Sequence, residues 1–336
     1  MKTICFWLNH LGIEHLWLDA REVIKTDGNH RKAKENWALT QAAVEEKIGI
    51  SGFTLTQGFI GSDTNNFTTT LGREGSDYTA AIIAAVMNAS ILEIWTDVSG
   101  MFTTNPKLIK NAKPIQKLSY LEAIELSHFG AKVLYPPTVQ PVLDLNIPIH
   151  IKNTLDPESV GTIISNNHIN SGIPVKGISN INNIALLTLQ GSGMIGIPGF
   201  SKRLFETLSQ EKINVILITQ ASSEHSICIG IDDKDADLAK NAIDNTFENE
   251  IALNKIDPII VETNLSIIAL IGDNMKNHQG ISGKMFSSLG KNNINIRAIA
   301  QGASEKNISA VILQNDVKKA YNMYLGNNLH LINQLN

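Results

Sequence analysis

The sequence is poor in cysteine, in charge of a single sign and in long apolar runs. Its 336 residues include two cysteines, Cys5 and Cys228, and carry a net charge of −4. Two such distant cysteines make neither a disulfide framework nor a metal-ligand pair, and a reducing compartment suits them. The near balance of charge argues against a broad nucleic-acid-binding surface. Because no apolar stretch approaches the ~20 residues of a membrane span, we predict a cytoplasmic protein with no membrane or nucleic-acid partner.

Metal-ligand spacings and a secretory leader are also missing from the pattern. The nine histidines show no H-E-x-x-H or paired spacing, so we predict no metal cluster held by side chains. The first ten residues, MKTICFWLNH, have their apolar stretch cut by Asn9 and His10, and they lack a small-residue cleavage site. They predict an amphipathic helix rather than a signal peptide.

The first half of the chain alternates strand-like and helix-like segments. Strands are predicted at 15–19, 53–60, 91–96 and 147–151, and helices at 77–89 and near 119–128. This alternation is typical of an α/β layered domain with a largely parallel sheet. The polar, turn-rich residues 166–172 predict a linker after that domain. With 43% hydrophobic residues, the chain is long enough for about two packed domains of roughly 150 residues.

The second half contains an internal repeat. Residues 213–227 and 294–308 align at an offset of 81 residues, the separation of Gln220 from Gln301. The same offset aligns Asn214 with Asn295, Ser223 with Ser304, Glu224 with Glu305, Gly199 with Gly280, Phe205 with Phe286 and Leu208 with Leu289. Each copy predicts strand, glycine turn, amphipathic helix, strand, turn and strand. Because one copy alone would leave an open sheet edge, we expect the two copies to pair and cover each other.

A glycine-rich turn precedes the apolar helix predicted at 77–89. Residues 71–79 read LGREGSDYT, so Ser76 or Asp77 is placed to cap the helix. A helix start offers free N–H groups to an anion, and the guanidinium of Arg73 suits a carboxylate or a phosphate. Taken alone, the turn is better explained as a capped surface turn with a solvated arginine.

Further segments give this turn a context. Residues 93–106 read EIWTDVSGMFTTNP, residues 129–136 read FGAKVLYP, and residues 151–154 read IKNT. Gly161 and Thr162 follow, and residues 175–179 read VKGIS. Together with LGREGSDYTAA, these segments resemble the signature segments of the aspartate kinase family in order and spacing. The resemblance spans nearly the whole chain and is nearest to the kinase plus ACT portion of bifunctional aspartokinase–homoserine dehydrogenases.

The resemblance implies a fold and an activity. It implies an incomplete three-layer α/β amino-acid-kinase-like domain at 1–165, a linker at 166–175 and two ferredoxin-like ACT units at 176–336. It also implies transfer of the γ-phosphoryl group of ATP, accompanied by Mg²⁺, to the side-chain carboxylate of L-aspartate, in the pathway to threonine, lysine and methionine. Assembly into a homo-oligomer through the ACT units is a further expectation of the resemblance.

The resemblance also assigns roles to single residues. Arg73 matches the arginine that clamps the aspartate substrate. Ser76 and Asp77 match the serine and the aspartate beside the transferring phosphate, and they are the catalytic candidates. Nucleotide-contacting positions of the family match Thr96, Asp97, Phe102, Lys107 and Lys132.

Two of these positions depart from the family pattern, and others have simpler explanations. Phe102 stands where the family often has tyrosine, so a hydroxyl contact is lost. Lys107 stands where arginine is common, which keeps the charge but not the bidentate fork. Thr96 and Asp97 alone would be explained by the end of a strand, and Lys132 by an ordinary surface lysine.

Two family segments are not found in the sequence. One is a Lys-Phe-Gly-Gly-Thr-Ser type loop that supplies a lysine and backbone N–H groups to the phosphates. The other carries a Gly-Glu pair that holds the amino group of the substrate. We therefore expect a chain that is truncated at its N-terminus and that lacks a fused dehydrogenase domain. Because phosphoryl transfer needs positive charge against the γ-phosphate, the alternative is a non-catalytic amino-acid-binding regulator or an inactive fragment.

The paired glutamines of the repeat predict an amino-acid site. Gln220 and Gln301 end equivalent strands, and a glutamine side chain offers one acceptor and two donors to an amino acid. Resemblance to threonine-sensing family members at both positions implies L-threonine as the feedback effector. Asn214 and Asn295 are the additional binding candidates. The alternative is that the glutamines only tie down turns.

A dinucleotide-binding interpretation does not hold for the second half. Gly191, Gly193 and Gly196 fit G-x-G-x-x-G after an apolar strand. The next strand ends in Gln220, where a dinucleotide site needs an acidic residue about 20 positions on. We therefore interpret these glycines as the turn of the first ACT unit.

Overall fold

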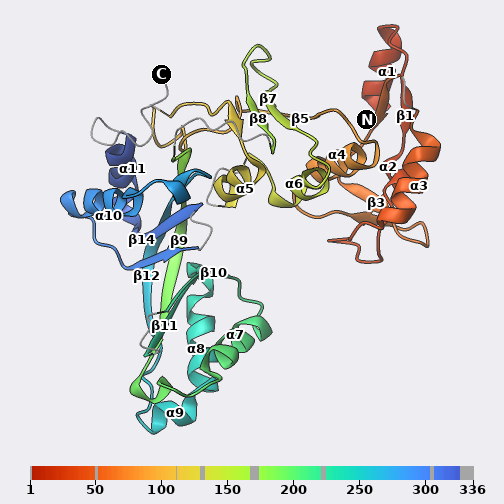
Figure 1. Ribbon diagram of the computed structural model, residues 1–336. Helices are drawn as coiled ribbons and strands as arrows, with labels where there is room; N and C mark the ends of the chain where they lie inside the picture. The colour runs from red at the N-terminus through yellow and green to blue at the C-terminus, as the bar shows by residue number, and fades with distance from the viewer. Residues whose placement is uncertain are drawn as a thin grey trace. The chain divides into compact units, whose positions relative to one another are not determined.

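The computed structural model describes residues 2–49, 52–110, 112–128, 133–166, 174–220, 225–302 and 306–325. These residues form two compact units (Figure 1), which we treat separately. Unit 1 comprises the described residues of 2–101, 114–128 and 133–166. Unit 2 comprises those of 102–113 and 174–325. Segment 102–113 thus belongs to unit 2, although we expected it within a domain at 1–165. Most of the expected linker, 167–173, lies outside the described residues.

Unit 1 mixes helices and short strands. In chain order its elements are α1 (Lys2–His10), β1 (Leu16–Leu18), α2 (Ala20–Val23), α3 (Trp37–Lys47), β2 (Thr54–Thr56), β3 (Ile60–Ser62), β4 (Thr68–Thr70), α4 (Gly75–Val86), β5 (Leu92–Thr96), β6 (Lys117–Leu118), α5 (Tyr120–His128), α6 (Pro136–Leu143), β7 (Ile149–Asn153) and β8 (Thr162–Ile164).

The strands of unit 1 form three small sheets. β1 and β2 pair in parallel, β3 and β4 form an antiparallel hairpin, and a four-stranded sheet has the order β5-β7-β8-β6. The pair β5–β7 is parallel and the pair β7–β8 antiparallel. The predicted α/β character and the predicted N-terminal helix are confirmed. The single strand predicted at 53–60 is wrong, because the chain turns at Gly58 and Phe59 and makes two strands, β2 and β3.

The start of α4 differs from the prediction. The helix begins at Gly75, so Ser76 and Asp77 already lie inside its first turn and do not cap it. The cap position is Glu74, which has a left-handed backbone with φ of 54° and makes no side-chain cap hydrogen bond. The first N–H groups of α4 are therefore not occupied by a capping side chain.

Unit 2 contains the repeat. Its strands and α-helices are β9 (Gly177–Gln190), α7 (Phe200–Gln210), β10 (Val215–Gln220), β11 (Ser226–Asp232), α8 (Ala236–Thr246), α9 (Glu248–Ala252), β12 (Ile260–Ile271), α10 (Ile281–Lys291), β13 (Ala298–Gln301), β14 (Asn307–Leu313) and α11 (Val317–Leu325). The strands form one sheet of order β10-β11-β9-β12-β14-β13. The predicted repeat is confirmed, but the second long helix of each copy, α8 or α11, was not foreseen.

The two copies share the long strands β9 and β12. Repeat A, defined as residues 184–262, uses the second half of β9, which pairs with β11, and the start of β12, which pairs with β9 on its other side. Repeat B, defined as residues 265–325 together with 177–181, uses the second half of β12 and takes the first half of β9 as its outer strand.

The exchange of strands has a local signature. Asn183 and Asn264, at the equivalent points where β9 and β12 pass from one repeat to the other, both have positive φ, 57° and 58°. Asparagine tolerates this left-handed backbone better than most residues. Repeat B is therefore a circularly permuted version of repeat A, since its fourth strand precedes repeat A in the sequence.

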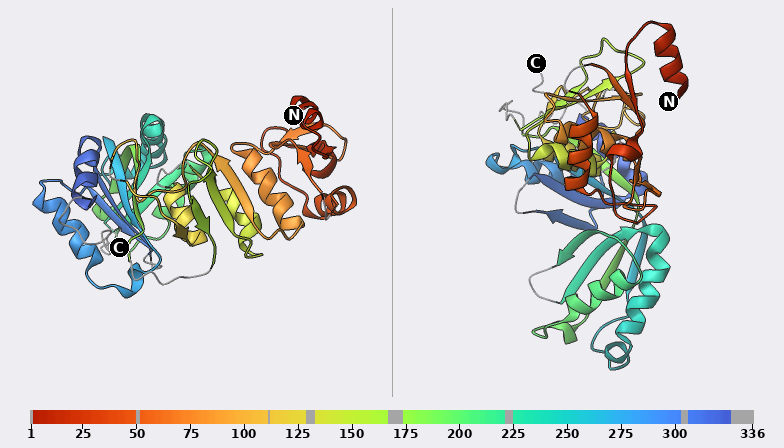
Figure 2. Two further views of the ribbon diagram at one scale, coloured as in Figure 1. Left: turned by 90° about the horizontal axis from the view of Figure 1, so that it is seen from above. Right: turned by 90° about the vertical axis from the view of Figure 1, so that its right-hand side faces the viewer.

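Each repeat has its own apolar core. Figure 2 shows the helices of repeat A on one face of its strands. The buried core of repeat A includes Leu187, Leu204, Leu208, Ile229, Ile243 and Phe247. That of repeat B includes Ile178, Ile268, Met285, Leu289, Ile312 and Tyr321. Leu204 and Met285 occupy the same position of the repeat. Among the described residues, no helix is long and apolar enough to cross a bilayer.

The sharing of β9 by the two repeats leads to a prediction about Ile178. This side chain is 1% exposed and packs in the core of repeat B, although it precedes repeat A in the chain. We expect Ile178→Ala to destabilise repeat B by about 2–5 kcal/mol, because it leaves a cavity. Peptide-resolved hydrogen exchange should then show faster exchange in β14 and the second half of β12.

The matched control is Ile259→Ala. Ile259 is the equivalent residue beside β12, is 4% exposed and packs in the core of repeat A. This variant should loosen α7 and β11 instead. Identical exchange patterns in the two variants would contradict the exchange of strands.

Candidate functional site

The turn before α4 carries three of the predicted site residues. Arg73 lies between Gly72, with φ of 84°, and Glu74, with φ of 54°, and Ser76 and Asp77 follow in the first helical turn. These two left-handed residues flank Arg73 directly before the helix start. The structure thus brings Arg73, Ser76 and Asp77 onto one short stretch of unit 1, as the sequence predicted.

A neighbouring turn packs closely against this helix start. A Cβ atom at Gly58 would lie 2.7 Å from the Cα atom of Ser76, and one at Gly75 would lie 2.9 Å from the ring of Phe59. Glycine is therefore required at both positions for the two turns to touch. The contact fixes where Ser76 lies relative to residues 57–60.

Phe59 is a candidate ligand-site residue that the sequence analysis missed. Its φ is 78°, a strained backbone for a bulky residue that costs of order 1–3 kcal/mol. Two hydrogen bonds hold it: its N–H donates to Thr79 Oγ1 at 3.0 Å, and its carbonyl accepts from the Leu71 N–H at 2.9 Å. Such strain gathers at ligand sites. The available signal was QGFIG at 57–61, a bulky residue directly after a glycine.

A pocket of about 380 Å³ opens beside the same helix start. Ser76 and Thr79 supply hydroxyl groups to its wall, and the apolar face of α4 supplies much of the rest. The lining residues are Thr56, Gln57, Gly58, Ser76, Thr79, Ala80, Ile83, Ala84, Met87 and Ala89. A mostly apolar hollow with a few polar groups in its wall is typical of a small-molecule site.

The charges at the turn suit an anionic ligand. The Arg73 side chain is exposed, with its Nε 3.5 Å from Glu74 Oε1. Burial raises the pKa of the Asp77 carboxyl, the negative charge of Glu74 raises that pKa further, and a hydrogen bond from Ser76 opposes both. The guanidinium and the helix N–H groups together provide positive potential.

Thr96 and Asp97 lie at the carboxyl end of β5. The Thr96 hydroxyl donates to Asp97 Oδ1 at 3.2 Å, and the Thr96 carbonyl accepts from the Thr154 N–H at 2.8 Å. Because β5 and β7 are parallel, their carboxyl ends meet at one edge of the sheet, where α/β proteins bind ligands. Asp97 is exposed at this edge.

The other three nucleotide candidates do not lie at the end of β5. Phe102, half-buried, and Lys107, exposed, belong to unit 2. The Lys107 N–H donates to Asn105 Oδ1 at 2.9 Å. Lys132 lies outside the described residues. The predicted nucleotide-contacting residues that the structure describes are therefore divided between unit 1 and unit 2.

The regulatory candidates occupy equivalent places in the repeats. Gln220 and Gln301 are the exposed last residues of β10 and β13. The Ser282 hydroxyl donates to Gln301 Oε1 at 3.3 Å and joins β13 to α10. The outer strands β10 and β13 also contact each other, so the two glutamine-bearing strands lie side by side.

The asparagine candidates do not share an end of the strand with the glutamines. Asn214 comes immediately before β10 and Asn295 a few residues before β13, and both are exposed. Six residues of extended chain between Asn214 and Gln220 span about 20 Å. Within one repeat, the structure does not bring an asparagine and a glutamine into a single small site.

Repeat B carries an ion pair that the sequence analysis did not foresee. Lys306 Nζ lies 3.1 Å from Asp273 Oδ1, and the Asp273 side chain is 10% exposed. The equivalent positions of repeat A hold Ser192 and His225. The available signal was Gly272-Asp-Asn274, directly after the first strand of the second repeat, which the sequence analysis did not use. The two repeats therefore share a fold but differ in charge at the turn that follows their first strand.

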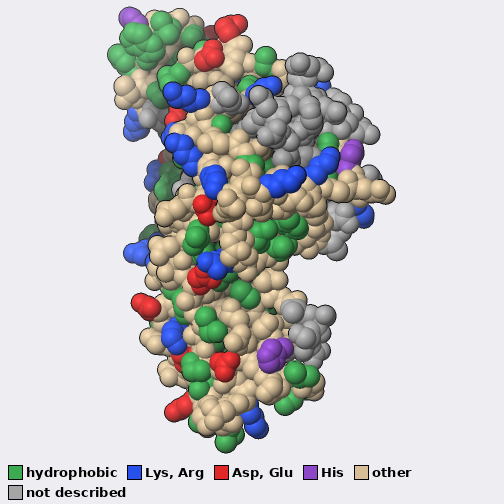
Figure 3. Space-filling model, turned by 90° about the vertical axis from the view of Figure 1, so that its left-hand side faces the viewer, with side chains coloured by type: hydrophobic (Ala, Val, Ile, Leu, Met, Phe, Trp, Pro, Cys, Tyr) green, Lys and Arg blue, Asp and Glu red, His purple; other side chains and the backbone are tan. Residues whose placement is uncertain are grey.

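The charged side chains of the described residues bear on whether the protein could hold a metal ion. Over the described residues, no group of three or more histidine, cysteine, aspartate or glutamate side chains is arranged to hold a metal ion. A Mg²⁺ ion that arrives with nucleotide phosphates needs only one or two protein carboxylates. The face drawn in Figure 3 carries both basic and acidic side chains.

Family models match both halves of the chain. The amino acid kinase family matches residues 2–153, and the ACT domain matches residues 187–247 and 268–323. The lysine-sensitive aspartokinase 3 of Escherichia coli is 34% identical over 95% of this chain and 71% of its own length. The chain belongs to the aspartokinase family. The glycine turn at 191–196 falls within the first ACT match, as predicted.

Other aspartokinase relatives show how much of a longer protein the chain matches. The bifunctional aspartokinase/homoserine dehydrogenase of Haemophilus influenzae is 45% identical over 97% of this chain, which spans 40% of that relative. The crystal structure of Clostridium acetobutylicum aspartate kinase superposes with a TM-score of 0.84 at 31% identity, covering 96% of this chain and 72% of that one. E. coli aspartokinase III in complex with aspartate and ADP gives 0.75 at 32% identity, covering 93% and 69%.

The raised pKa of Asp77 predicts a pH-dependent effect on stability. The folded carboxyl holds its proton more tightly than the unfolded one, whose pKa is about 3.8. Its stabilising contribution is therefore present at low pH and lost as pH rises through the folded pKa. Asp77→Asn should raise Tm at pH 7, and the difference should shrink as the pH approaches 3.8. Calorimetric scans of both proteins test this, with Asp97→Asn as the exposed control. A lower Tm for Asp77→Asn at every pH would contradict the prediction.

Proposed function

We propose that the chain carries aspartokinase chemistry: transfer of the γ-phosphoryl group of Mg-ATP to the side-chain carboxylate of L-aspartate, giving 4-phospho-L-aspartate. The observation that carries this proposal is the turn at Arg73, Ser76 and Asp77, in a chain of the aspartokinase family. A relative is known in complex with aspartate and ADP. The product would enter the biosynthesis of threonine, lysine and methionine in the cytoplasm.

Each site residue has a chemical role in this proposal. Arg73 pairs with a carboxylate of aspartate through its planar fork. Ser76 and Asp77 lie where the phosphoryl group transfers, with the N–H groups of α4 directed at its charge. Mg²⁺ would neutralise the ATP phosphates. The adenine nucleotide would contact Thr96, Asp97, Phe102, Lys107 and Lys132.

The ACT repeats are proposed to bind a feedback amino acid, L-threonine, through Gln220 and Gln301. Both glutamines are exposed at the ends of contacting outer strands, and each offers donors and an acceptor. A lysine complex of the E. coli relative supports an amino acid as the class of effector. ACT units of two subunits would also pair to form a homo-oligomer.

A second candidate function is a non-catalytic amino-acid-binding regulator. The observation that favours it is the pair of ACT repeats, each with its own apolar core and with an exposed glutamine at the end of β10 or β13. The kinase reaction would in addition need a Lys-Phe-Gly-Gly-Thr-Ser type loop, which the given 336 residues do not include. Losing a single preorganised donor costs ~10²–10³ in rate, and such a loop supplies several. The repeats would still bind their ligand in that case.

An activity assay separates these functions. We expect little ADP release by the chain alone with ATP, Mg²⁺ and L-aspartate. Turnover should appear in a fusion with the phosphate-loop segment of the H. influenzae relative. In that fusion Arg73→Ala should lower kcat/KM for aspartate by ~30- to 3,000-fold, corresponding to about 2–5 kcal/mol for a truncated charge pair. The value for ATP should change far less.

The controls of this assay decide the role of Arg73. Arg73→Lys keeps the charge without the fork and should fall between the parent and Arg73→Ala. Equal losses for both substrates would assign Arg73 to folding. A fusion without turnover would refute the proposed reaction. Turnover of ~1–100 s⁻¹, the ordinary kinase range, by the chain alone would refute the need for the loop.

A calorimetric titration tests the effector site. We expect threonine to bind the chain with a millimolar Kd or better, near −4.1 kcal/mol, and Gln220→Ala and Gln301→Ala to weaken it. Lysine and methionine serve as competing ligands, and Gln210→Ala, at the exposed end of α7, is the matched control. The threonine site is wrong if 10 mM threonine gives neither heat nor a thermal shift, or if both glutamine variants bind unchanged.

A further inference from the structure

Segment 102–113 contacts repeat B through its backbone and through buried side chains. The Thr103 carbonyl accepts the N–H of Ile178 at 2.8 Å, so the segment attaches to the first half of β9. Ile109 is 6% exposed and belongs to the same core cluster as Ile178 and Tyr321. The segment is therefore held by the repeat rather than lying on its surface.

The described part of the segment forms a closed loop. The Thr103 N–H donates to the Lys113 carbonyl at 2.9 Å, and the Lys113 N–H donates to Thr103 Oγ1 at 3.1 Å. Between these residues, the N–H of Ile109 donates to the Asn105 carbonyl at 3.1 Å. The base of the loop is thus fixed on β9, and Ile109 fixes its far side in the core.

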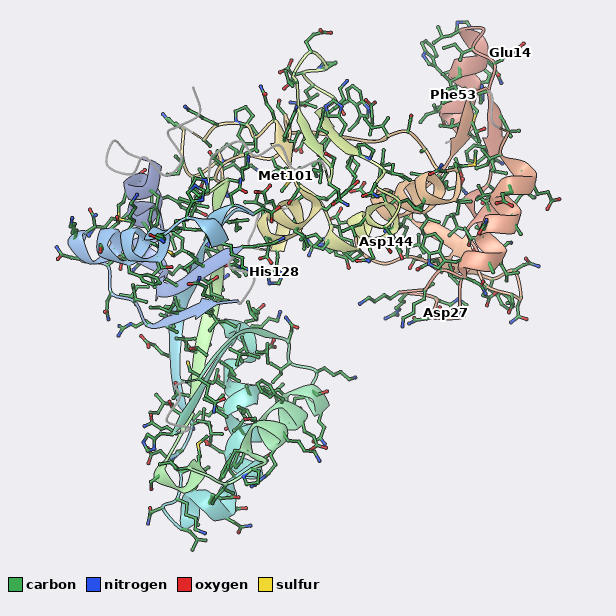
Figure 4. The ribbon with its side chains drawn as sticks, viewed as in Figure 1. Glu14, Asp27, Phe53, Met101, His128 and Asp144 are labelled. Atoms are coloured by element: carbon green, nitrogen blue, oxygen red, sulfur yellow. The ribbon has the colours of Figure 1, made fainter. Side chains whose placement is uncertain are left out.

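The residues that flank the segment are fixed in unit 1. The N–H of Met101, labelled in Figure 4, donates to Thr162 Oγ1 at 2.8 Å, and the Met101 carbonyl accepts from the Ile115 N–H at 2.8 Å. Thr162 Oγ1 in turn donates to the Ile115 carbonyl at 2.6 Å. Thr162 is fully buried, so these hydrogen bonds hold Met101 and Ile115 in unit 1. The chain passes from unit 1 to unit 2 between Met101 and Phe102, and it returns between Lys113 and Pro114.

We propose that repeat B sets the conformation of segment 102–113 and that Ile109 is a positioning residue for Phe102 and Lys107. The functional part of this proposal rests on the nucleotide-contacting role proposed above for those two residues. Lys107 is exposed, and the loop that holds it is anchored two residues later at Ile109. Loosening of repeat B then weakens nucleotide binding at this loop without any contact between repeat B and the nucleotide.

Adjacent residues of the loop give a matched pair of variants. Ile109 is 6% exposed and Leu108 40% exposed. In hydrogen exchange of the full chain, Ile109→Ala should speed exchange of residues 102–113 and 175–179 by roughly tenfold or more. Leu108→Ala should leave both peptides near the parent rate. Equal rates for the two variants would overturn the anchor.

The repeat gives a second matched pair, far from the loop in sequence. Met285 on α10 and Leu204 on α7 are equivalent core residues, 0% and 1% exposed. Met285→Ala should speed exchange of residues 102–113, and Leu204→Ala should not. If Leu204→Ala loosens the segment equally, or if Met285→Ala loosens repeat B alone, control by repeat B is refuted. Met285→Leu replaces Met285→Ala if the latter fails to fold.

Calorimetry with Mg-ADP tests the positioning role. Ile109→Ala should weaken Mg-ADP binding by roughly fivefold or more, the lower end of ordinary coupling between sites. Ile109→Val should restore it, and Leu108→Ala should not alter it. Unchanged affinity in Ile109→Ala overturns the positioning role. If neither the chain nor its fusion with the phosphate-loop segment binds Mg-ADP, the proposed nucleotide site itself is refuted, whereas the exchange results decide separately what holds the segment.

Discussion

The backbone pairing of β9 with β12 is the constraint on which the rest of unit 2 depends. These two strands run through both repeats, so each repeat contains one part of β9 and one part of β12. An antiparallel ladder cannot slip by one residue without turning its buried side chains to the other face. The register therefore fixes both cores at once. It also fixes Ile178, to which segment 102–113 is attached.

The sequence predicted this arrangement in part. The 81-residue offset revealed two similar copies, because the matches at Gln220 and Gln301 and around them survive without any knowledge of pairing. The exchange of strands was not predictable in the same way, since the fourth strand of a copy carries few identities and the apolar pattern of residues 177–190 reads as one strand. Helices α8 and α11 were missed because the identities that defined the repeat lie before them.

The candidate site was likewise predicted only in part. Arg73, Ser76 and Asp77 are neighbours in the chain, so their proximity was safe to predict from LGREGSDYT. The cap was predicted wrongly, because a left-handed Glu74 is an exception to ordinary capping preferences. The strained backbone of Phe59 could not be predicted from the sequence, since positive φ at a bulky residue follows from tertiary contacts rather than from local propensity. The membership of 102–113 in unit 2 likewise depends on tertiary contacts, the Thr103–Ile178 backbone hydrogen bond and the buried Ile109, that a sequence pattern does not single out.

The circular permutation of repeat B also bears on how such a molecule can originate. If one repeat were a separate polypeptide with its extra leading strand, that strand would find the open edge of a second copy and the exchange would become an interlocked dimer. The present chain holds both copies covalently, with Asn183 and Asn264 at the crossing points. A pairing that would otherwise depend on protein concentration is thereby made intramolecular, at an effective concentration set by the connecting residues.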